Sequence, residues 1–232
     1  MSRGQSSVIG VAILVAATVV AVAGMTAAVG TVIEDRATTA AADRTAAAFD
    51  EALDPNAAGP GRERIVLAGG RLRTVERTLR VRAAGRTVAT YEVGGLRYEA
   101  RGRSVTYVSG AIVRSTPACA TVRGDPPVRA AEGDLFVSVV ALGTDPGRVT
   151  DAGRVTLRTN ASHERRRLDP GEYRIAVETR APGAWARRFD AAEGTTRTDI
   201  DGDGVPSAVV DPAGEGRVRL AIHRLDLEVT AG

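Results

Sequence analysis

The 232-residue sequence has no lysine, a single cysteine and few aromatic residues. All 31 of its basic side chains are arginines, and aromatic residues make up 3% of the chain. The lone Cys119 excludes an intramolecular disulfide, and we expect it to be a buried, unreactive thiol. With so few aromatics, a core has to be built mainly from small and β-branched side chains, among which Ala and Val are abundant.

Residue patterns that carry catalysis are also missing. The only histidines, His163 and His223, have no carboxylate at metal-ligand spacing, so we expect His163 on the surface and His223 in a structural role. There is no Ser–His–Asp order, phosphate-binding glycine loop or Cys/His cluster. We therefore expect a protein that is not an enzyme, with no catalytic residues and no cofactor apart from the calcium considered below.

The distribution of charge argues against nucleic-acid binding. The net charge is only +3, and along much of the chain Arg and Glu alternate, as on a solvated protein face. No basic stripe with interleaved aromatics is present, which is what single-stranded or groove recognition requires. We expect no nucleic-acid partner.

The longest uncharged run lies at the N-terminus, from Gly4 to Ile33. Within it, Val8 to Val29 is apolar apart from two threonines, which as a helix gives roughly 33 Å, enough for a bilayer core of about 30 Å. The run is too long for an ordinary signal peptide and lacks a polar cleavage region. The sequence therefore predicts a membrane span at residues 8–33. Arg3 on one side and Glu34-Asp35 on the other predict a cytoplasmic N-terminus and an extracellular C-terminal domain.

The helical pattern continues beyond the uncharged run through an Ala-rich stretch to Leu53. Pro55 disfavours helical geometry at the residue before it, so the helix should stop near Leu53. We thus divide the chain into residues 1–4, a helix at 5–54, a linker at 55–63 and a β-rich domain at 64–232.

The very short basic start Met1-Ser2-Arg3-Gly4, followed by Gln5-Ser6-Ser7 and the apolar run, resembles the class III signal peptide of archaeal type IV pilins and archaellins. It looks most like haloarchaeal pilin-like proteins. The resemblance implies that a prepilin peptidase cuts between Gly4 and Gln5 and that the helix is kept, first in the membrane and then in a surface filament. Ile9 stands where bacterial pilins carry Glu, so the match is of the archaeal type.

Small residues recur along the same helix and form a stripe that consists of Ala16, Ala17, Ala21, Gly24 and Ala28. Small side chains let helix backbones approach closely, which favours helix–helix packing. The resemblance implies that other pilin subunits are the partners. The alternative is that they only reflect an Ala-rich composition.

Beyond residue 63 the pattern alternates between apolar and polar residues, as in half-buried strands. Gly-containing turns about eight residues apart indicate a hairpin meander, and Leu135 to Leu142 reads as a central strand. The apolar phase changes at His223-Arg224, which predicts a bulge or strand break. One short helix is expected at Pro182 to Ala192. The fold class expected is α+β: a long transmembrane, pilin-like helix followed by an all-β, sandwich-like head.

Two motifs in this head suggest ligands. Asp199, Asp201 and Asp203 alternate as in the first half of a calcium loop, with Ser207 as a further oxygen donor, but Val210 stands where Glu is required. The alternative is a polar turn. Asn160-Ala161-Ser162 is an N-glycosylation sequon.

Two functions remain open. The first is a pilin-like cell-surface protein, anchored in the membrane by its N-terminal helix, that joins a type IV pilus-like filament as a minor or major subunit. The second is a single-pass surface protein that does not assemble and whose β head binds a partner or Ca²⁺.

Overall fold

The computed structural model describes residues 3–57, 59–124, 127–131, 134–143, 149–151, 153–189, 196–200, 204–210 and 216–232. Side chains are not described for residues 3–13, 24, 26–31, 130–131, 149 and 196–198. The chain divides into two compact units, Met1–Ala40 and Ala41–Gly232, the second of which we call the β-rich unit. Each unit is described by itself.

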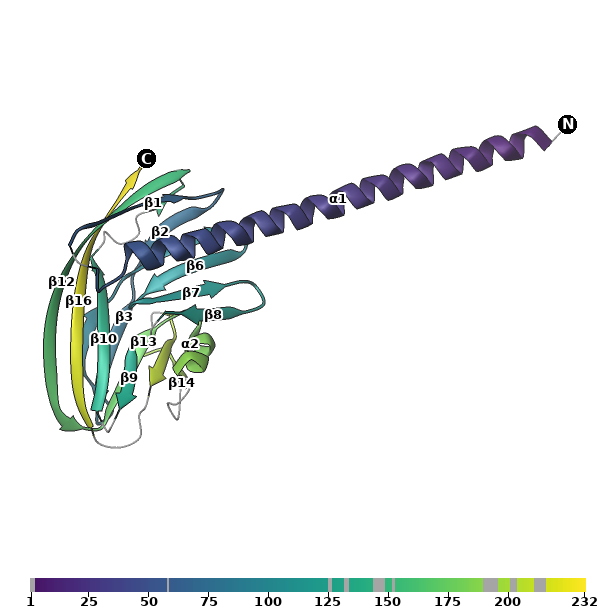
Figure 1. Cartoon of the computed structure of the whole chain (residues 1–232). Coiled ribbons are helices and arrows are strands. Elements are labelled where there is room, and N and C mark those ends of the chain that lie inside the picture. Colours follow the sequence, from purple (N-terminus) through teal and green to yellow (C-terminus); the bar gives the residue numbers. More distant parts are fainter. Residues whose placement is uncertain are drawn as a thin grey trace. The chain divides into compact units, whose positions relative to one another are not determined.

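The N-terminal helix α1 runs from Arg3 to Ala52, and its last turns belong to the β-rich unit (Figure 1). It ends just before the Asp54-Pro55 pair, where proline geometry stops a helix. The backbone N–H of Leu53 donates to the Phe49 carbonyl at 2.9 Å, and the Asp54 carboxylate accepts the N–H of Asn56 at 2.9 Å. The chain then turns into strand β1, which begins at Gly61, ahead of the expected domain start at residue 64.

In the described part of the chain, no helix is both long enough and apolar enough to cross a membrane. This contradicts the membrane span predicted at residues 8–33 and the predicted single-pass localisation. The prediction rested on the length of the uncharged, apolar run, much of which is Ala, Gly and Thr, residues that favour insertion less than Leu, Ile or Phe.

The predicted fold class was wrong as well, because the structure is mostly β. Across the described residues, sixteen strands form three sheets, two of them with five strands and one with six. A single sandwich-like head was expected, but three sheets are found, because the sheet that a strand joins depends on pairing between residues far apart in the sequence, which the local pattern does not show.

The first sheet, which we call the long-strand sheet, has the order β1-β12-β16-β10-β9. Its strands are Gly61–Val66, Arg154–Gly171, Gly216–Ala231, Asp134–Gly143 and Val128–Ala131. All neighbours are antiparallel except β10 and β16, which run parallel. As predicted, β10 is an interior strand, with β16 and β9 on its two sides.

The second sheet, the meander sheet, has the order β11-β2-β5-β6-β7-β8. Its strands are Val149–Thr150, Arg71–Val75, Gly95–Ala100, Arg103–Val108, Ala111–Ser115 and Ala120–Arg123. The hairpin turns at Arg101-Gly102 and Ser109-Gly110 have positive φ at both residues (44° and 76°, 48° and 80°). Two-residue turns of this kind match the twist of the flanking strands. The predicted hairpin meander is confirmed for β5 to β7.

The third sheet has the order β14-β15-β13-β3-β4. Its strands are Thr196–Thr198, Ser207–Val210, Tyr173–Glu178, Thr78–Ala83 and Arg86–Glu92. Helix α2, Pro182–Phe189, lies within the expected helix at Pro182 to Ala192, of which residues 190–192 are outside the described residues. It places Trp185 in the core with no exposed surface. Cys119, expected to be buried, is exposed, because it lies in the turn between β7 and β8.

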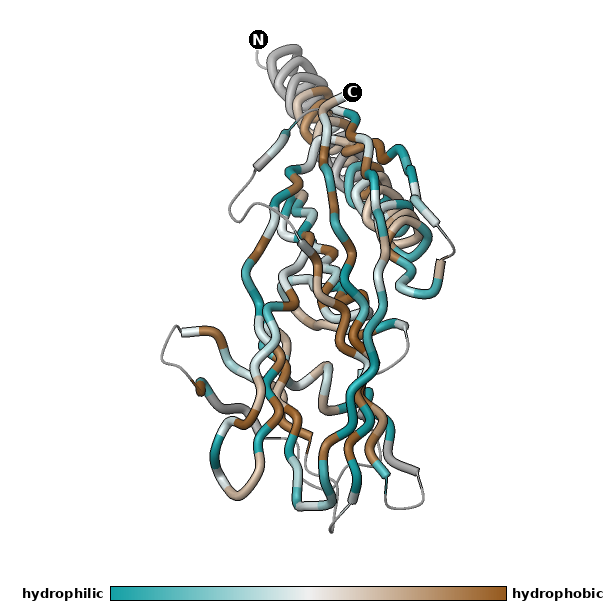
Figure 2. Tube along the Cα trace, turned by 90° about the vertical axis from the view of Figure 1, so that its left-hand side faces the viewer, coloured by the Kyte–Doolittle hydropathy of each residue, from teal (hydrophilic) through white to brown (hydrophobic). Residues whose placement is uncertain are grey.

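Two hydrophobic cores lie within the β-rich unit. In the first, the last turns of α1 pack against the long-strand and meander sheets through Ala46, Phe49 and Leu53. The second joins all three sheets and contains Trp185 of α2. Apolar and polar residues alternate along the long strands in Figure 2, as expected for strands with one buried and one solvent-exposed face.

The strand β16 serves both cores with opposite faces. Leu220 and Ile222 lie in the second core, whereas Leu225 and Leu227 lie in the first. The pairing with β12 continues without a register shift through His223-Arg224. The predicted bulge or strand break was therefore wrong. Since adjacent residues point to opposite faces of a strand, the change of phase marks the place where the covered face changes.

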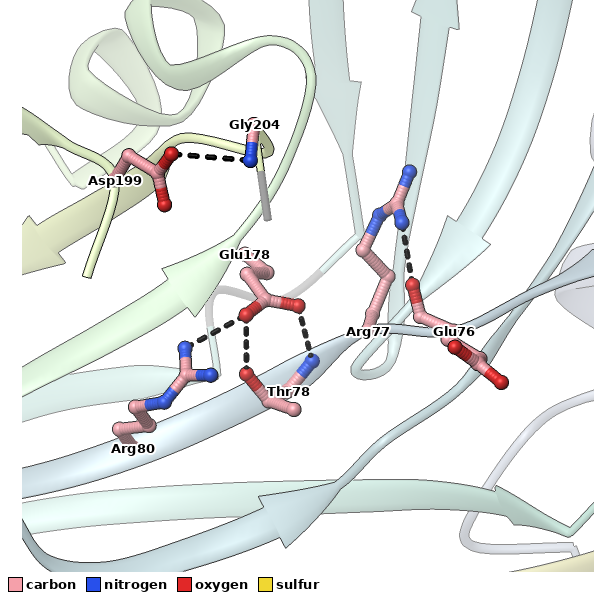
Figure 3. Close-up of polar contacts among 7 residues, drawn as sticks. All are labelled: Glu76, Arg77, Thr78, Arg80, Glu178, Asp199 and Gly204. Carbon is pink, nitrogen blue, oxygen red and sulfur yellow. Dashed lines mark hydrogen bonds and ion pairs between the residues drawn. The ribbon is translucent and has the colours of Figure 1, made fainter. Parts of the chain in front are cut away.

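A buried ion pair links two strands of the third sheet (Figure 3). The carboxylate of Glu178 on β13 accepts hydrogen bonds from Arg80 at 2.7 Å and from the hydroxyl and backbone N–H of Thr78 at 2.6 and 2.9 Å. Both charged side chains are nearly inaccessible to solvent. Because the pair is hydrogen-bonded as well as charge-matched, it can be held in the interior, and we assign it a structural role.

Candidate functional site

The N-terminal helix carries an unusual exposed surface, which we call the apolar segment, residues 14–33. The described side chains from Leu14 to Ala23 are all exposed, and the large apolar side chains that are described in the segment are 50–72% exposed. They are Leu14, Val15, Val19, Val20, Val22, Met25, Val32 and Ile33. Contiguous apolar surface of this kind marks an interaction site in a folded protein.

Across the described side chains of the apolar segment, no side of the helix is polar. Successive helical residues turn by about 100°, so Val15, Val22 and Ile33 share one side and Ala17 lies on the opposite one. The hydroxyl of Thr18 donates to the Leu14 carbonyl at 2.8 Å, which satisfies its only strong donor within the helix. A helix that is apolar all round is normally surrounded by other apolar groups.

The last turns of α1 are held within the β-rich unit by hydrogen bonds from the meander sheet and the long-strand sheet. The Tyr107 hydroxyl on β6 donates to the Leu53 carbonyl at 2.7 Å, and the Thr159 hydroxyl on β12 donates to the Ala52 carbonyl at 3.2 Å. These bonds satisfy carbonyls that a helix C-terminus leaves unpaired. Burial raises the pKa of Tyr107, and Asp54 and Asp50 raise it further, so the phenol stays a donor. Asp43 also forms an ion pair with Arg114.

A second candidate site is a cavity of about 580 Å³ at one end of the meander sheet, which we call the arginine pocket. It lies between the start of β2, the β5–β6 turn and the residues that follow β7. Hydroxyls of Ser104, Ser115 and Thr116 also line it. Its charged lining consists of Arg71, Arg97, Arg101, Arg103, Glu99 and Asp151.

The charges of the arginine pocket do not balance. Glu99 accepts hydrogen bonds from Arg97 at 2.6 Å and from Arg73, outside the pocket, at 3.3 Å. Burial acts to raise the pKa of Glu99, but these bonds and the charges of Arg97 and Arg73 outweigh it and leave the pKa below its usual value. Its charge is thus shared between two guanidinium groups, and four arginines face two carboxylates around the cavity.

The predicted calcium loop is only partly described. Asp201 and Asp203 lie outside the described residues. The carboxylate of Asp199 accepts the backbone N–H of Gly204 at 3.0 Å, as in a polar turn (Figure 3). Ser207 lies in β15 and is fully buried. Over the residues that the structure covers, no group of three or more His, Cys, Asp or Glu is placed to hold a metal.

The other predicted residues lie on separate elements. Gly4 and Gln5, the expected cleavage position, are in the first turn of α1. Asn160 is an exposed residue of β12, opposite Asp226 of β16. His163 is exposed as expected, but it lies directly opposite His223 on the neighbouring strand. Sequence reasoning missed this pair and the arginine pocket, since both depend on strand pairing between distant residues.

The fold and the site define a class of protein in which a helix with an exposed apolar segment precedes a three-sheet unit. Residues 3–228 match a family of unknown function (DUF7289), and the chain belongs to that family. The match runs from the start of α1 into β16, so helix and sheets are parts of one family unit. No curated protein matches the chain, and no solved structure does.

Proposed function

We propose that this protein is a structural subunit, similar to pilins, that assembles with other copies of itself through the apolar segment of α1. The observation that carries the proposal is the set of described large apolar side chains, 50–72% exposed, in a segment of α1 that carries no charged residue. Complete burial of such a side chain is worth roughly 1.5–3 kcal/mol relative to full exposure, and burying the part that is exposed here contributes a corresponding share. Because the segment carries no charge, copies of it do not repel one another.

The small residues of the apolar segment favour other copies of the same helix as the partner that covers it. Ala16, Ala17 and Ala21 are exposed alongside the valines, and small side chains allow close approach of helix backbones. The β-rich unit is held to the last turns of α1 by a buried core and two hydrogen bonds. An assembly of helices would therefore carry the β-rich units with it.

Sedimentation of the full chain tests this proposal. The wild type should form large assemblies, and V19D/V22D should be monomeric, because each Asp would bring a charge into an apolar contact. The matched control is V88D: Val88 is 54% exposed, on the edge strand β4 of the β-rich unit. A monomeric wild type, or equal dispersal by both substitutions, would overturn the proposal.

Processing between Gly4 and Gln5 by a prepilin peptidase remains a prediction that follows from the resemblance to pilins. The intact mass of the protein isolated from its cells decides it: the residues Met1-Ser2-Arg3-Gly4 should be missing.

The arginine pocket favours a second candidate function, the binding of a small anionic ligand by the β-rich unit. Guanidinium groups bind carboxylate, sulfate and phosphate in a planar, two-pronged fashion, and the pocket volume of about 580 Å³ suits a ligand of sugar or nucleotide size. Four arginines against two carboxylates leave the lining positive.

Titration with inorganic phosphate and with citrate tests the anion site. We expect R71A/R103A to weaken binding at least tenfold, while R158A should not, because Arg158 pairs with Glu228 on the long-strand sheet. Affinity should also fall with rising salt. Binding that the R71A/R103A substitution leaves unchanged would refute the site.

A further inference from the structure

The only two histidines of the sequence meet on the long-strand sheet. His163 of β12 and His223 of β16 are direct partners in the antiparallel register. Their Nδ1 atoms are 3.0 Å apart, and the ring centroids are separated by 5.0 Å at an interplanar angle of 80°. Sixty residues separate the two in sequence, so the contact is a product of the fold.

The positions of the protons follow from the neighbouring carbonyl. The Nδ1 atom of His223 is also 3.2 Å from the Pro55 carbonyl oxygen. A carbonyl only accepts, so His223 carries its proton on Nδ1 and directs it between Pro55 and His163. His163 therefore presents the lone pair of its Nδ1 to the same point and carries its proton on Nε2.

The surroundings keep His223 neutral near neutral pH. Burial lowers the pKa of His223, and His163 and Arg165 lower it further, against the Pro55 carbonyl and Asp54, which raise it. A neutral imidazole is the form that binds metal ions. The carboxylate of the neighbouring Glu164 accepts hydrogen bonds from Arg166 and Arg224.

We propose that His163 and His223 form a binding site for a transition-metal ion of the Cu²⁺ or Ni²⁺ type, held by the two Nδ1 atoms. With metal–nitrogen bonds of about 2.0–2.1 Å, an Nδ1–Nδ1 separation of 3.0 Å gives a nitrogen–metal–nitrogen angle of roughly 95°. That angle suits the square-planar or tetragonal geometry of Cu²⁺ and Ni²⁺ better than tetrahedral Zn²⁺.

Binding requires a change of tautomer at His223. The proton of His223 moves from Nδ1 to Nε2, so both imidazoles stay neutral and no proton is lost from the pair. His163 is exposed to solvent, and the Pro55 carbonyl oxygen lies 3.2 Å from the Nδ1 atom of His223. A bound ion would join β12 to β16 next to the residues that follow α1.

Calorimetric titration of the full chain with NiCl₂ at pH 7.5 tests the site. Cys119 is exposed, so the experiment uses a C119S background to remove a competing thiol. We expect one ion per chain, at least tenfold weaker binding in both H163A and H223A, and loss of binding near pH 5, where imidazoles become protonated. CaCl₂ is the control, because Ca²⁺ prefers oxygen ligands.

A spectroscopic readout separates the metal site from a merely structural role of the pair. The electron paramagnetic resonance spectrum of one equivalent of Cu²⁺ should show coupling to two nitrogens in the parent and to fewer in H163A, whose exposed position leaves the fold intact. Binding that survives both substitutions, or that depends on only one of the two histidines, would overturn the proposal.

Discussion

At the scale of single residues, the hydrogen bond from the Tyr107 hydroxyl to the Leu53 carbonyl attaches the C-terminal end of α1 to the meander sheet. Tyr107 is 2% exposed and its donor–acceptor distance is 2.7 Å. Replacing it by Phe leaves the Leu53 carbonyl buried and unpaired, so we expect Y107F to lower the free energy of unfolding by about 1–3 kcal/mol. Chemical denaturation of the full chain measures the loss.

The matched control is Y173F. The Tyr173 hydroxyl also donates to a backbone carbonyl, that of Asp169 at 2.8 Å, but at an exposed position where water can replace it. Y173F should therefore change stability by less than about 0.5 kcal/mol. Equal losses in the two variants would show that Tyr107 does not anchor the helix.

Single residues also show where sequence reasoning ends. The two-residue turns could be predicted, because Gly after Arg101 and after Ser109 satisfies a local need for positive φ. The exposure of Cys119 could not be predicted, because it depends on the turn in which the residue lies. The His163–His223 contact depends on a register set by fifteen paired positions along two long strands.

At the scale of elements, α1 has two parts with different roles. Its last turns belong to the β-rich unit and place Phe49 in the first core with no exposed surface. We expect F49A to lower the free energy of unfolding of the β-rich unit by about 3–5 kcal/mol, because the deleted ring leaves a cavity. Denaturation followed by the fluorescence of Trp185 measures this change.

The control for the same helix is V19A. Val19 is 62% exposed, so its truncation should leave the unfolding of the β-rich unit within about 0.5 kcal/mol of the parent. A large effect of V19A on Trp185 unfolding would show that the apolar segment serves the fold rather than assembly.

The strand β16 shows why element prediction was partly wrong. Its apolar pattern changes phase at His223-Arg224. If the strand covered a single core, that change would require a bulge, which is why a bulge was predicted. The structure has two cores, and β16 covers one with Ile222 and the other with Leu225. A pattern of period two locates the buried face of a strand but does not tell which neighbour buries it.

At the scale of the whole molecule, the sequence predicted a helix followed by strands but not three sheets. The position of a strand in a sheet depends on pairing partners far along the chain, such as β3 with β13. The membrane span was wrong for a different reason. It was inferred from the length of an uncharged, apolar run, a local property that does not by itself show what surrounds the helix.

The central claim is that copies of the chain meet through the apolar segment of α1. Disulfide cross-linking between introduced cysteines measures this contact directly, in a C119S background that removes the native thiol. V19C places a cysteine in the segment, and V88C places one on β4 at similar exposure, 62% against 54% for the native valines.

The account predicts that V19C forms intermolecular disulfides rapidly at micromolar concentration and that V88C does not. Adding A17L, which enlarges the small side of the helix, should slow the V19C reaction several-fold. Equal and slow cross-linking of V19C and V88C would contradict assembly through α1.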